Sequence, residues 1–174
     1  MRPIFLKGIA ISEKIVIASD HGAFDLKQKL IERLKKLGFD TLDMGVHDAK
    51  SVDYPDYAKK VARAVSRGEF RRGILLCGTG IGMSITANKF PKVRATLAYD
   101  TYTARMSRLH NDSNILVMGG RTTGDEVAYE ILETWLHTPY EGGRHDKRIN
   151  KISELDGMMA HDSEEEGEPA DGSD

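Results

Sequence analysis

Short apolar runs alternate with amphipathic stretches along this chain, and the alternation limits the possible folds more than any other feature. The apolar runs lie at 14–19, 39–43, 73–76, 93–98 and 114–118. Between them, apolar residues recur at helical spacing in stretches that end at Gly38, Gly68 and Pro139. Strands that alternate with helices pair in parallel, and helices cover both faces of a parallel sheet. We therefore expect an α/β fold, a three-layer α/β/α sandwich with a Rossmann-like five-stranded parallel sheet.

The single cysteine, Cys77, follows the third apolar run and opens a glycine-rich turn, 77–82 (CGTGIG). Gly78, Gly80 and Gly82 allow a tight turn whose N–H groups point inward, and such turns attract anions. A helix-like stretch follows, and its dipole adds positive potential. These surroundings favour the thiolate, which acts as a base or a nucleophile. The other interpretation is a small buried hydrophobe, the usual role of a lone cysteine at the end of a strand.

The turn fails to match three familiar anion-binding motifs. A P-loop closes with Gly-Lys-Ser/Thr, but Met83 and Ser84 follow Gly82 here. A dinucleotide fingerprint has the spacing GxGxxG after the first strand, whereas this turn has GxGxG after the third. A cysteine-dependent phosphatase needs an arginine where Met83 stands. What remains is a cradle for an anion formed during reaction, such as an enediolate, beside a proton-transfer base.

The residues that follow the other apolar runs add to this site. Asp20 and His21 follow the first run, Asp100 follows the fourth, and Arg121 follows the fifth. In open parallel sheets, ligands bind beyond the carboxyl ends of the strands. We therefore expect these side chains to gather near Cys77.

Composition limits the partners and the compartment. The formal net charge is −2, but residues 161–174 carry seven acidic and no basic residues, so the other 160 residues carry +5. A weakly positive body suits an anionic small molecule and lacks the basic stripe of a nucleic-acid binder. One cysteine cannot form an internal disulfide, and no apolar run approaches the roughly 18 residues of a membrane span. We expect a cytoplasmic protein with no nucleic-acid or membrane partner.

Six stretches, taken together and in order, resemble the type B ribose-5-phosphate isomerases, a family that also holds galactose-6-phosphate and allose-6-phosphate isomerases. They are 18–22 (ASDHG), 53–58 (DYPDYA), 73–82 (GILLCGTGIG), 87–89 (ANK), 107–112 (SRLHND) and 140–145 (YEGGRH). The resemblance runs from about residue 14 to residue 152. It implies an enzyme of the pentose phosphate pathway that interconverts ribose 5-phosphate and ribulose 5-phosphate through an enediolate.

The resemblance also implies a role for each matching residue. Cys77 is the proton-transfer base, and Thr79 holds the enediolate together with the following backbone amides. His110 helps to open the sugar ring, a general acid–base task that suits imidazole. No metal or cofactor is implied. The substrate-binding residues implied in this way are Asp20, His21, Gly78, Gly80, Ile81, Gly82, Asn111, Arg121, Arg144 and Arg148.

Four of these residues, His21, Arg121, Arg144 and Arg148, are expected to bind the phosphate. Arg144 and Arg148 are four residues apart, so on the helix expected at 144–156 they would share one face, and guanidinium groups suit phosphate oxygens. A solvated charged helix is the alternative. In similar proteins this segment reaches into the neighbouring subunit, which implies a homodimer with shared active sites and leaves a tetramer open.

The domain expectations are an N-terminal extension at 1–13, an isomerase domain at 14–155 and a mobile acidic tail at 156–174. The loop at 45–53 varies within the family and is expected to influence the choice of sugar. Two other functions stay open at this point. One is a galactose-6-phosphate or allose-6-phosphate isomerase, and the other is a non-catalytic sugar-phosphate sensor with the same fold.

Overall fold

The computed structural model describes residues 13–165 of the 174-residue chain, with side chains up to Met158. The chain divides into two compact units, one that ends at Glu141 and one that begins at Gly142. This division falls inside the domain expected at 14–155. Residues 1–12 of the expected N-terminal extension and residues 166–174 of the expected tail lie outside the described part.

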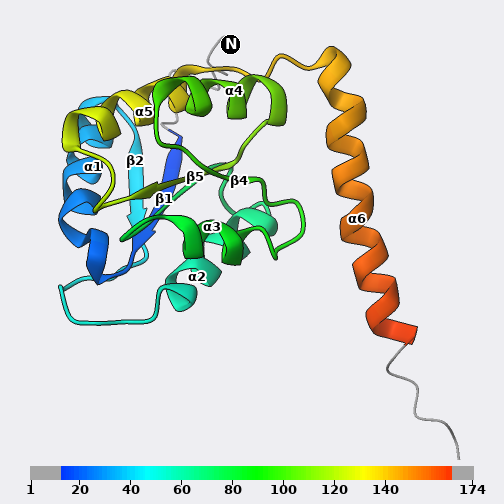
Figure 1. Cartoon of the computed structure of the whole chain (residues 1–174), viewed down its shortest axis with the longest axis horizontal. Coiled ribbons are helices and arrows are strands. Elements are labelled where there is room, and N and C mark those ends of the chain that lie inside the picture. The colour runs from blue at the N-terminus through cyan, green and yellow to red at the C-terminus, as the bar shows by residue number, and fades with distance from the viewer. Residues whose placement is uncertain (1–12, 166–174) are drawn as a thin grey trace, which may run out of the picture. The chain divides into compact units, whose positions relative to one another are not determined.

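The first unit contains the predicted five-stranded parallel sheet, in the order β2-β1-β3-β5-β4 (Figure 1). Its strands are β1 (Lys14–Ser19), β2 (Asp40–Asp43), β3 (Gly73–Cys77), β4 (Ala95–Leu97) and β5 (Ile115–Gly119). Every pair of neighbouring strands is parallel. The expected strands therefore all form, with shifts of one or two residues at several ends.

Helices cover both faces of the sheet, so the expected three layers are confirmed (Figure 1). One face carries α1 (Phe24–Lys36), which follows the short helix η1 (His21–Ala23), together with α4 (Thr101–Asn111) and α5 (Asp125–His137). The other face carries α2 (Tyr54–Ser66) and α3 (Ile81–Ala87). Apolar spacing did not predict α4, because its buried residues are Ala104, Ser107 and Arg108.

The core forms two clusters, one on each face of the sheet. Along β1, Ile15 and Ile17 pack toward α1, while Val16 and Ala18 pack toward α2, and all four are fully buried. Burial on both faces explains why the strands read as continuous apolar runs. Each large aliphatic side chain buried in this way contributes about 1.5–3 kcal/mol of transfer free energy.

The ring of Trp135 on α5 is fully buried between two arginines. The guanidinium groups of Arg72 and Arg108 lie 5.5 and 5.7 Å from its centroid. Its indole N–H donates to Oγ of Ser113 at 3.3 Å. Burial lowers the pKa of Arg108, partly offset by its partner Asp112. These contacts stabilise the edge of the sheet where the strands begin.

The second unit consists of η2 (Gly143–His145) and α6 (Asp146–Glu165). The expected helix at 144–156 is therefore longer than predicted, and it runs through Glu165 into the region expected to be a tail. Arg144 lies in η2, before α6 begins. Within the described residues, no helix has the length and apolar character needed to span a bilayer.

Candidate active site

The site lies at the topological switch point of the sheet, between β1 and β3. β1 has β2 on one side and β3 on the other, so the segments that follow β1 and β3 leave in opposite directions. Such a point opens a crevice at the carboxyl ends of the strands, which is where open α/β sheets bind ligands. Asp20 follows β1 and Cys77 ends β3, so both lie where this topology predicts the ligand crevice.

Cys77 is 5% exposed at the end of β3. Its sulfur accepts a hydrogen bond from the backbone N–H of Gly80 at 3.1 Å. Thr79 Oγ1 faces the N–H of Ile81 at 3.4 Å. The turn thus places one backbone donor, the Gly80 N–H, on the sulfur, where the sequence predicts several. Because α3 is only seven residues long, its dipole adds little.

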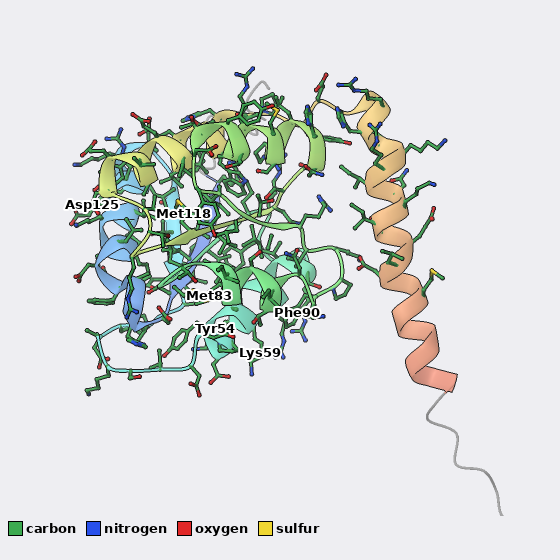
Figure 2. The ribbon with its side chains drawn as sticks, in the orientation of Figure 1. Tyr54, Lys59, Met83, Phe90, Met118 and Asp125 are labelled. Atoms are coloured by element: carbon green, nitrogen blue, oxygen red, sulfur yellow. The ribbon has the colours of Figure 1, made fainter. Side chains whose placement is uncertain are left out.

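Close packing and backbone conformation require a glycine at position 80 of this turn. Gly80 has φ +81°, and a Cβ there would lie 2.5 Å from Leu97 Cδ1 and 3.0 Å from the carbonyl carbon of Met118. A Cβ on Gly82 would lie 2.5 Å from the ring of Tyr54, in the first turn of α2 (Figure 2). Gly80 therefore has no room for a side chain, whereas at Gly82 the half-exposed Tyr54 ring would have to move.

Asp20 and the η1 corner lie beside this turn. The carboxylate of Asp20, which is 8% exposed, accepts a hydrogen bond from Gly22 N at 2.8 Å and caps η1. A Cβ on Gly22 would lie 3.3 Å from Gly78 N. The backbone N–H of Asp20 donates to the carbonyl of Leu76 at 3.1 Å. The Asp20 corner and the Cys77 turn are therefore in contact.

The segment after β5 completes this part of the site. The N–H groups of Gly120 and Arg121 donate to the carbonyls of Cys77 and Gly78 at 2.8 and 2.9 Å. The Arg121 side chain lies over Gly78, where a Cβ would be 3.5 Å from Arg121 Cδ. The predicted convergence of the segments after β1, β3 and β5 is thus observed. Asp100, after β4, serves instead as the N-cap of α4, and the N–H of Thr103 lowers the pKa of its carboxyl.

His21 makes a contact that the sequence does not suggest. Its Nδ1 accepts a hydrogen bond from the backbone N–H of Val52 at 3.2 Å. An amide can only donate, so Nδ1 carries its lone pair and the ring proton of the neutral imidazole lies on Nε2. The loop at 45–53 therefore orients His21 with Nε2–H as its free donor.

His110 and Asn111 lie at the other end of the sheet from Cys77. They end α4, and Arg94, just before β4, donates through Nε to the carbonyls of Asn111 and Asp112 at 3.0 Å each. The five residues of β3 separate the two ends by about 13 Å. His110 Nε2 lies 3.8 Å from a carboxylate oxygen of Glu141. Within one chain, the structure does not bring His110 and Asn111 to the Cys77 turn.

Arg144 and Arg148 belong to the second unit, and both are exposed. The Arg144 side chain contacts the neighbouring ring, with Nε 3.3 Å from His145 Nε2. The two arginines do not lie in one α-helix, because a 3-10 turn holds Arg144 and α6 holds Arg148.

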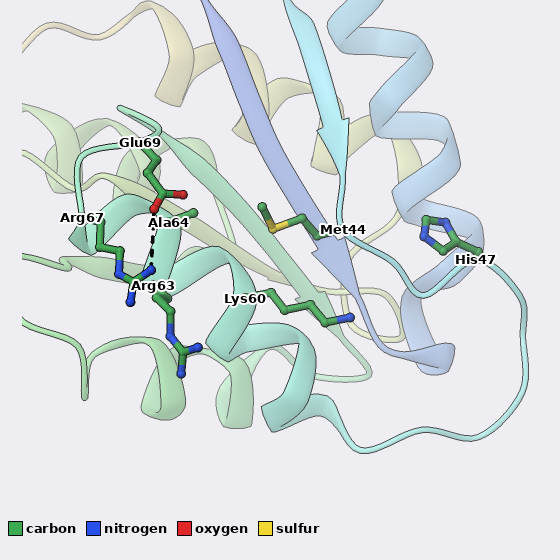
Figure 3. Close-up of a pocket in the computed structure, with 7 residues that line it drawn as sticks. All are labelled: Met44, His47, Lys60, Arg63, Ala64, Arg67 and Glu69. Atoms are coloured by element: carbon green, nitrogen blue, oxygen red, sulfur yellow. Dashed lines mark ion pairs between the residues drawn. The ribbon is translucent and has the colours of Figure 1, made fainter.

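A pocket of about 440 Å³ is lined by α2 and by the segment after β2 (Figure 3). Its lining is mostly basic and contains none of the predicted site residues: Met44, His47, Lys60, Arg63, Ala64, Arg67 and Glu69. Arg67 forms an ion pair with Glu69 at 3.8 Å.

The sequence expectations do not include one buried charge near the site. Lys27 on α1 is fully buried, and its ammonium contacts both carboxylate oxygens of Asp43 at 2.6 and 2.7 Å. The available signal was its position directly after Leu26 and three residues before Leu30, on the apolar face of α1. A lysine there needs a buried partner.

The chain is similar in sequence to known proteins. The family model described as Ribose/Galactose Isomerase matches residues 15–152. Ribose-5-phosphate isomerase B of Escherichia coli is 44% identical over 144 residues, which cover 83% of this chain and 97% of that protein.

Solved structures are also similar to this chain in fold and sequence. Ribose-5-phosphate isomerase B of Clostridium thermocellum has a TM-score of 0.82 and 50% identity, with 84% of this chain and 99% of that chain covered. Type B ribose 5-phosphate isomerase of Trypanosoma cruzi has a TM-score of 0.83 and 49% identity, with 86% and 99% covered. The chain belongs to the ribose/galactose isomerase family.

Proposed function

We propose that this protein interconverts ribose 5-phosphate and ribulose 5-phosphate in the cytoplasm, with Cys77 as the proton-transfer base. The observation that carries the proposal is the buried Cys77 sulfur, 3.1 Å from the N–H of Gly80 in a turn lined by backbone. A thiolate held by amide donors can take a proton from carbon, and the same donors can hold the oxyanion that results. Family membership supports the substrate class.

The reaction moves one proton between neighbouring carbons. The Cys77 thiolate removes the C2 proton of the open-chain aldose, and the C–H electron pair forms the C1=C2 bond while the carbonyl π electrons move to O1. The resulting enediolate lies against the amides of the 77–82 turn and the Thr79 hydroxyl. The thiol then returns the proton to C1, and the O2 proton passes to O1 as C2 becomes the carbonyl. Loss of one oxyanion donor typically costs about 3–4 kcal/mol of barrier.

The phosphate binds away from the sulfur in this proposal. His21 offers a neutral Nε2–H donor, and Arg121 lies over Gly78 beside the crevice. Arg144 and Arg148 supply further guanidinium groups, which suit a phosphate dianion. Asp20 binds a sugar hydroxyl through its second carboxylate oxygen, since the first accepts from Gly22.

The active site is shared between two copies of the chain in a homodimer. The support is that His110 and Asn111, needed for ring opening, lie at the far end of the sheet from Cys77. Exposed apolar side chains are available for an interface. They are Ile81 and Ile85 on α3, Tyr99 and Tyr102 after β4, and Ile152, Leu155 and Met158 on α6. A two-fold interface then lets each copy complete the site of the other.

The Cys77→Ala variant tests the base. We expect turnover to fall to background while phosphosugar binding, measured by calorimetry, is largely kept. The result would also separate an isomerase from a sugar-phosphate sensor. Unchanged turnover in this variant would refute the mechanism.

Subunit mixing tests the shared site. Cys77→Ala and His110→Ala are each expected to be inactive, but mixed dimers would contain one site with both side chains intact. Equal mixing should restore about one quarter of wild-type activity if dimers form at random. Absence of recovery, despite mixed dimers confirmed by mass spectrometry, would refute sharing. Mixing Cys77→Ala with Arg144→Ala tests in the same way whether Arg144 contributes to the site of the other copy.

The sugar itself is tested by kcat/KM for ribose 5-phosphate, allose 6-phosphate and galactose 6-phosphate. We expect the pentose phosphate to give the highest value. A clear preference for either hexose phosphate would replace the proposed substrate and leave the base and cradle unchanged.

A further inference from the structure

Among the residues that the structure describes, Lys27 is a fully buried charged side chain whose hydrogen bonds go to one short segment near the site. Its ammonium contacts both carboxylate oxygens of Asp43 and donates to the carbonyl of Val46 at 2.6 Å. Its side chain is fully buried, while that of Asp43 is 25% exposed. A buried ammonium without these partners would be strongly unfavourable, so the contacts fix the segment against α1.

The segment that Lys27 holds, 43–46, continues the pairing of β2 with β1 toward the site. Met44 N donates to the carbonyl of Ile17 at 2.8 Å, and Ser19 N donates to the carbonyl of Gly45 at 2.8 Å. Val46 N donates to the carbonyl of Ser19 at 3.0 Å. Lys27 therefore stabilises the backbone immediately before Asp20 and His21.

The same loop reaches His21 from its other end. Residues 47–51 are all exposed, so the loop is held mainly at its two ends. The first end is the segment 43–46, and the second is Val52, whose N–H donates to His21 Nδ1 at 3.2 Å. Displacement of the first end would therefore disturb the hydrogen bond that keeps the His21 proton on Nε2.

We propose that Lys27 is a positioning residue for substrate binding, which anchors the 43–53 loop so that Val52 holds His21 with Nε2–H directed to the phosphate. This inference rests on the proposed function, because that function makes His21 a phosphate ligand. Lys27 touches no reacting atom in this arrangement. Its removal should weaken binding of the phosphosugar and leave proton transfer at Cys77 nearly unchanged.

The test compares Lys27→Met with Lys29→Met. Lys29 lies on the same helix, but its ion pair with Asp125 is exposed, with 46% exposure on each side. For Lys27→Met we expect about a tenfold higher KM with kcat within about twofold, the size of effect that follows from loss of one hydrogen bond to a charged group. Lys29→Met should match the wild type. A KM unchanged in folded Lys27→Met would overturn the proposal.

A spectroscopic readout separates this inference from the isomerase assignment. Long-range ¹H–¹⁵N spectra of the ligand-free protein report which imidazole nitrogen carries the proton. We expect His21 to be protonated at Nε2 in the wild type and in Lys29→Met, and to exchange between tautomers in Lys27→Met. An inactive wild type that keeps this pattern would refute the proposed function alone. An unaltered His21 tautomer in Lys27→Met would overturn the role of Lys27.

A second variant covers the case in which Lys27→Met fails to fold. Val52→Pro removes the backbone N–H that contacts His21 and lies in an otherwise exposed loop. It should reproduce the mixed tautomer and the tenfold rise in KM while the buried Lys27–Asp43 pair remains intact. A wild-type tautomer and KM in Val52→Pro would show that the loop does not orient His21, and the proposal would fall.

Discussion

Gly80→Ala should be among the most destabilising single-methyl additions in this fold, and its cost can be worked out from two independent contributions. Gly80 has φ +81°, a left-handed conformation that costs alanine about 1–2 kcal/mol. The new Cβ would also lie 2.5 Å from Leu97 Cδ1 and 3.0 Å from the backbone of Met118. Overpacking of this kind costs about 1–3 kcal/mol. We expect the free energy of unfolding to fall by about 2–5 kcal/mol.

Gly38→Ala is the matched control, because it has the same backbone conformation without the crowding. Gly38 follows α1 with φ +82°, and a Cβ there would meet no atom within 4 Å. The free energy of unfolding of Gly38→Ala should therefore fall only by the conformational contribution, about 1–2 kcal/mol. Urea unfolding of both variants at one protein concentration, with unchanged m values, gives the comparison.

Equal losses of stability in the two variants would refute the steric part of this reasoning. A second consequence concerns the site, since the Gly80 N–H donates to the Cys77 sulfur. Gly80→Ala should therefore reduce kcat as well, whereas Gly38→Ala should leave it unchanged. Wild-type kcat in Gly80→Ala would indicate that this amide does not assist the sulfur.

Other variants test phosphate binding, the core and a helix cap. Arg121→Met should raise KM for the phosphosugar about tenfold or more with a smaller effect on kcat, because a charge-assisted contact is lost. An unchanged KM would show that Arg121 does not bind the phosphate. Leu30→Ala removes a fully buried side chain and should cost about 2–5 kcal/mol of unfolding free energy in urea, and a loss below 1 kcal/mol would contradict its burial. The pKa of Asp100 is lowered by the N–H of Thr103, so its contribution to stability is present above its unfolded pKa and is lost as pH falls through the folded value. Asp100→Asn, which keeps a cap but cannot titrate, should show a shallower loss of thermal stability in acid than the wild type, and identical acid profiles would contradict the assignment.

The sequence predicted the sheet and the Cys77 turn because each depends on local pattern. Fully buried parallel strands such as β1 leave continuous apolar runs, and Gly80 in the turn marks a place without room for a side chain. The helix that carries His110 was harder to predict from the sequence, because α4 buries small and polar residues such as Ser107 in place of an apolar stripe. Its direction, which carries His110 to the far end of the sheet, follows only from the topology.

The buried charge of Lys27 could not be predicted from pattern, because its partner Asp43 is sixteen residues away on another element. The contact between Val52 and His21 was equally hidden, since a backbone donor leaves no mark on the sequence. Long-range contacts of this kind depend on the register of β1 against β2 and on the path of the loop. Local propensity specifies neither.

The depth at which Cys77 lies also governs its exposure to oxidants. Only 5% of the residue is accessible, and the proposed function places the bound sugar against its sulfur. Thiolates are the forms that oxidants attack, so access limits damage here. A bound sugar phosphate should then protect the enzyme from inactivation, and its resistance to oxidative stress would rise and fall with the supply of its own substrate.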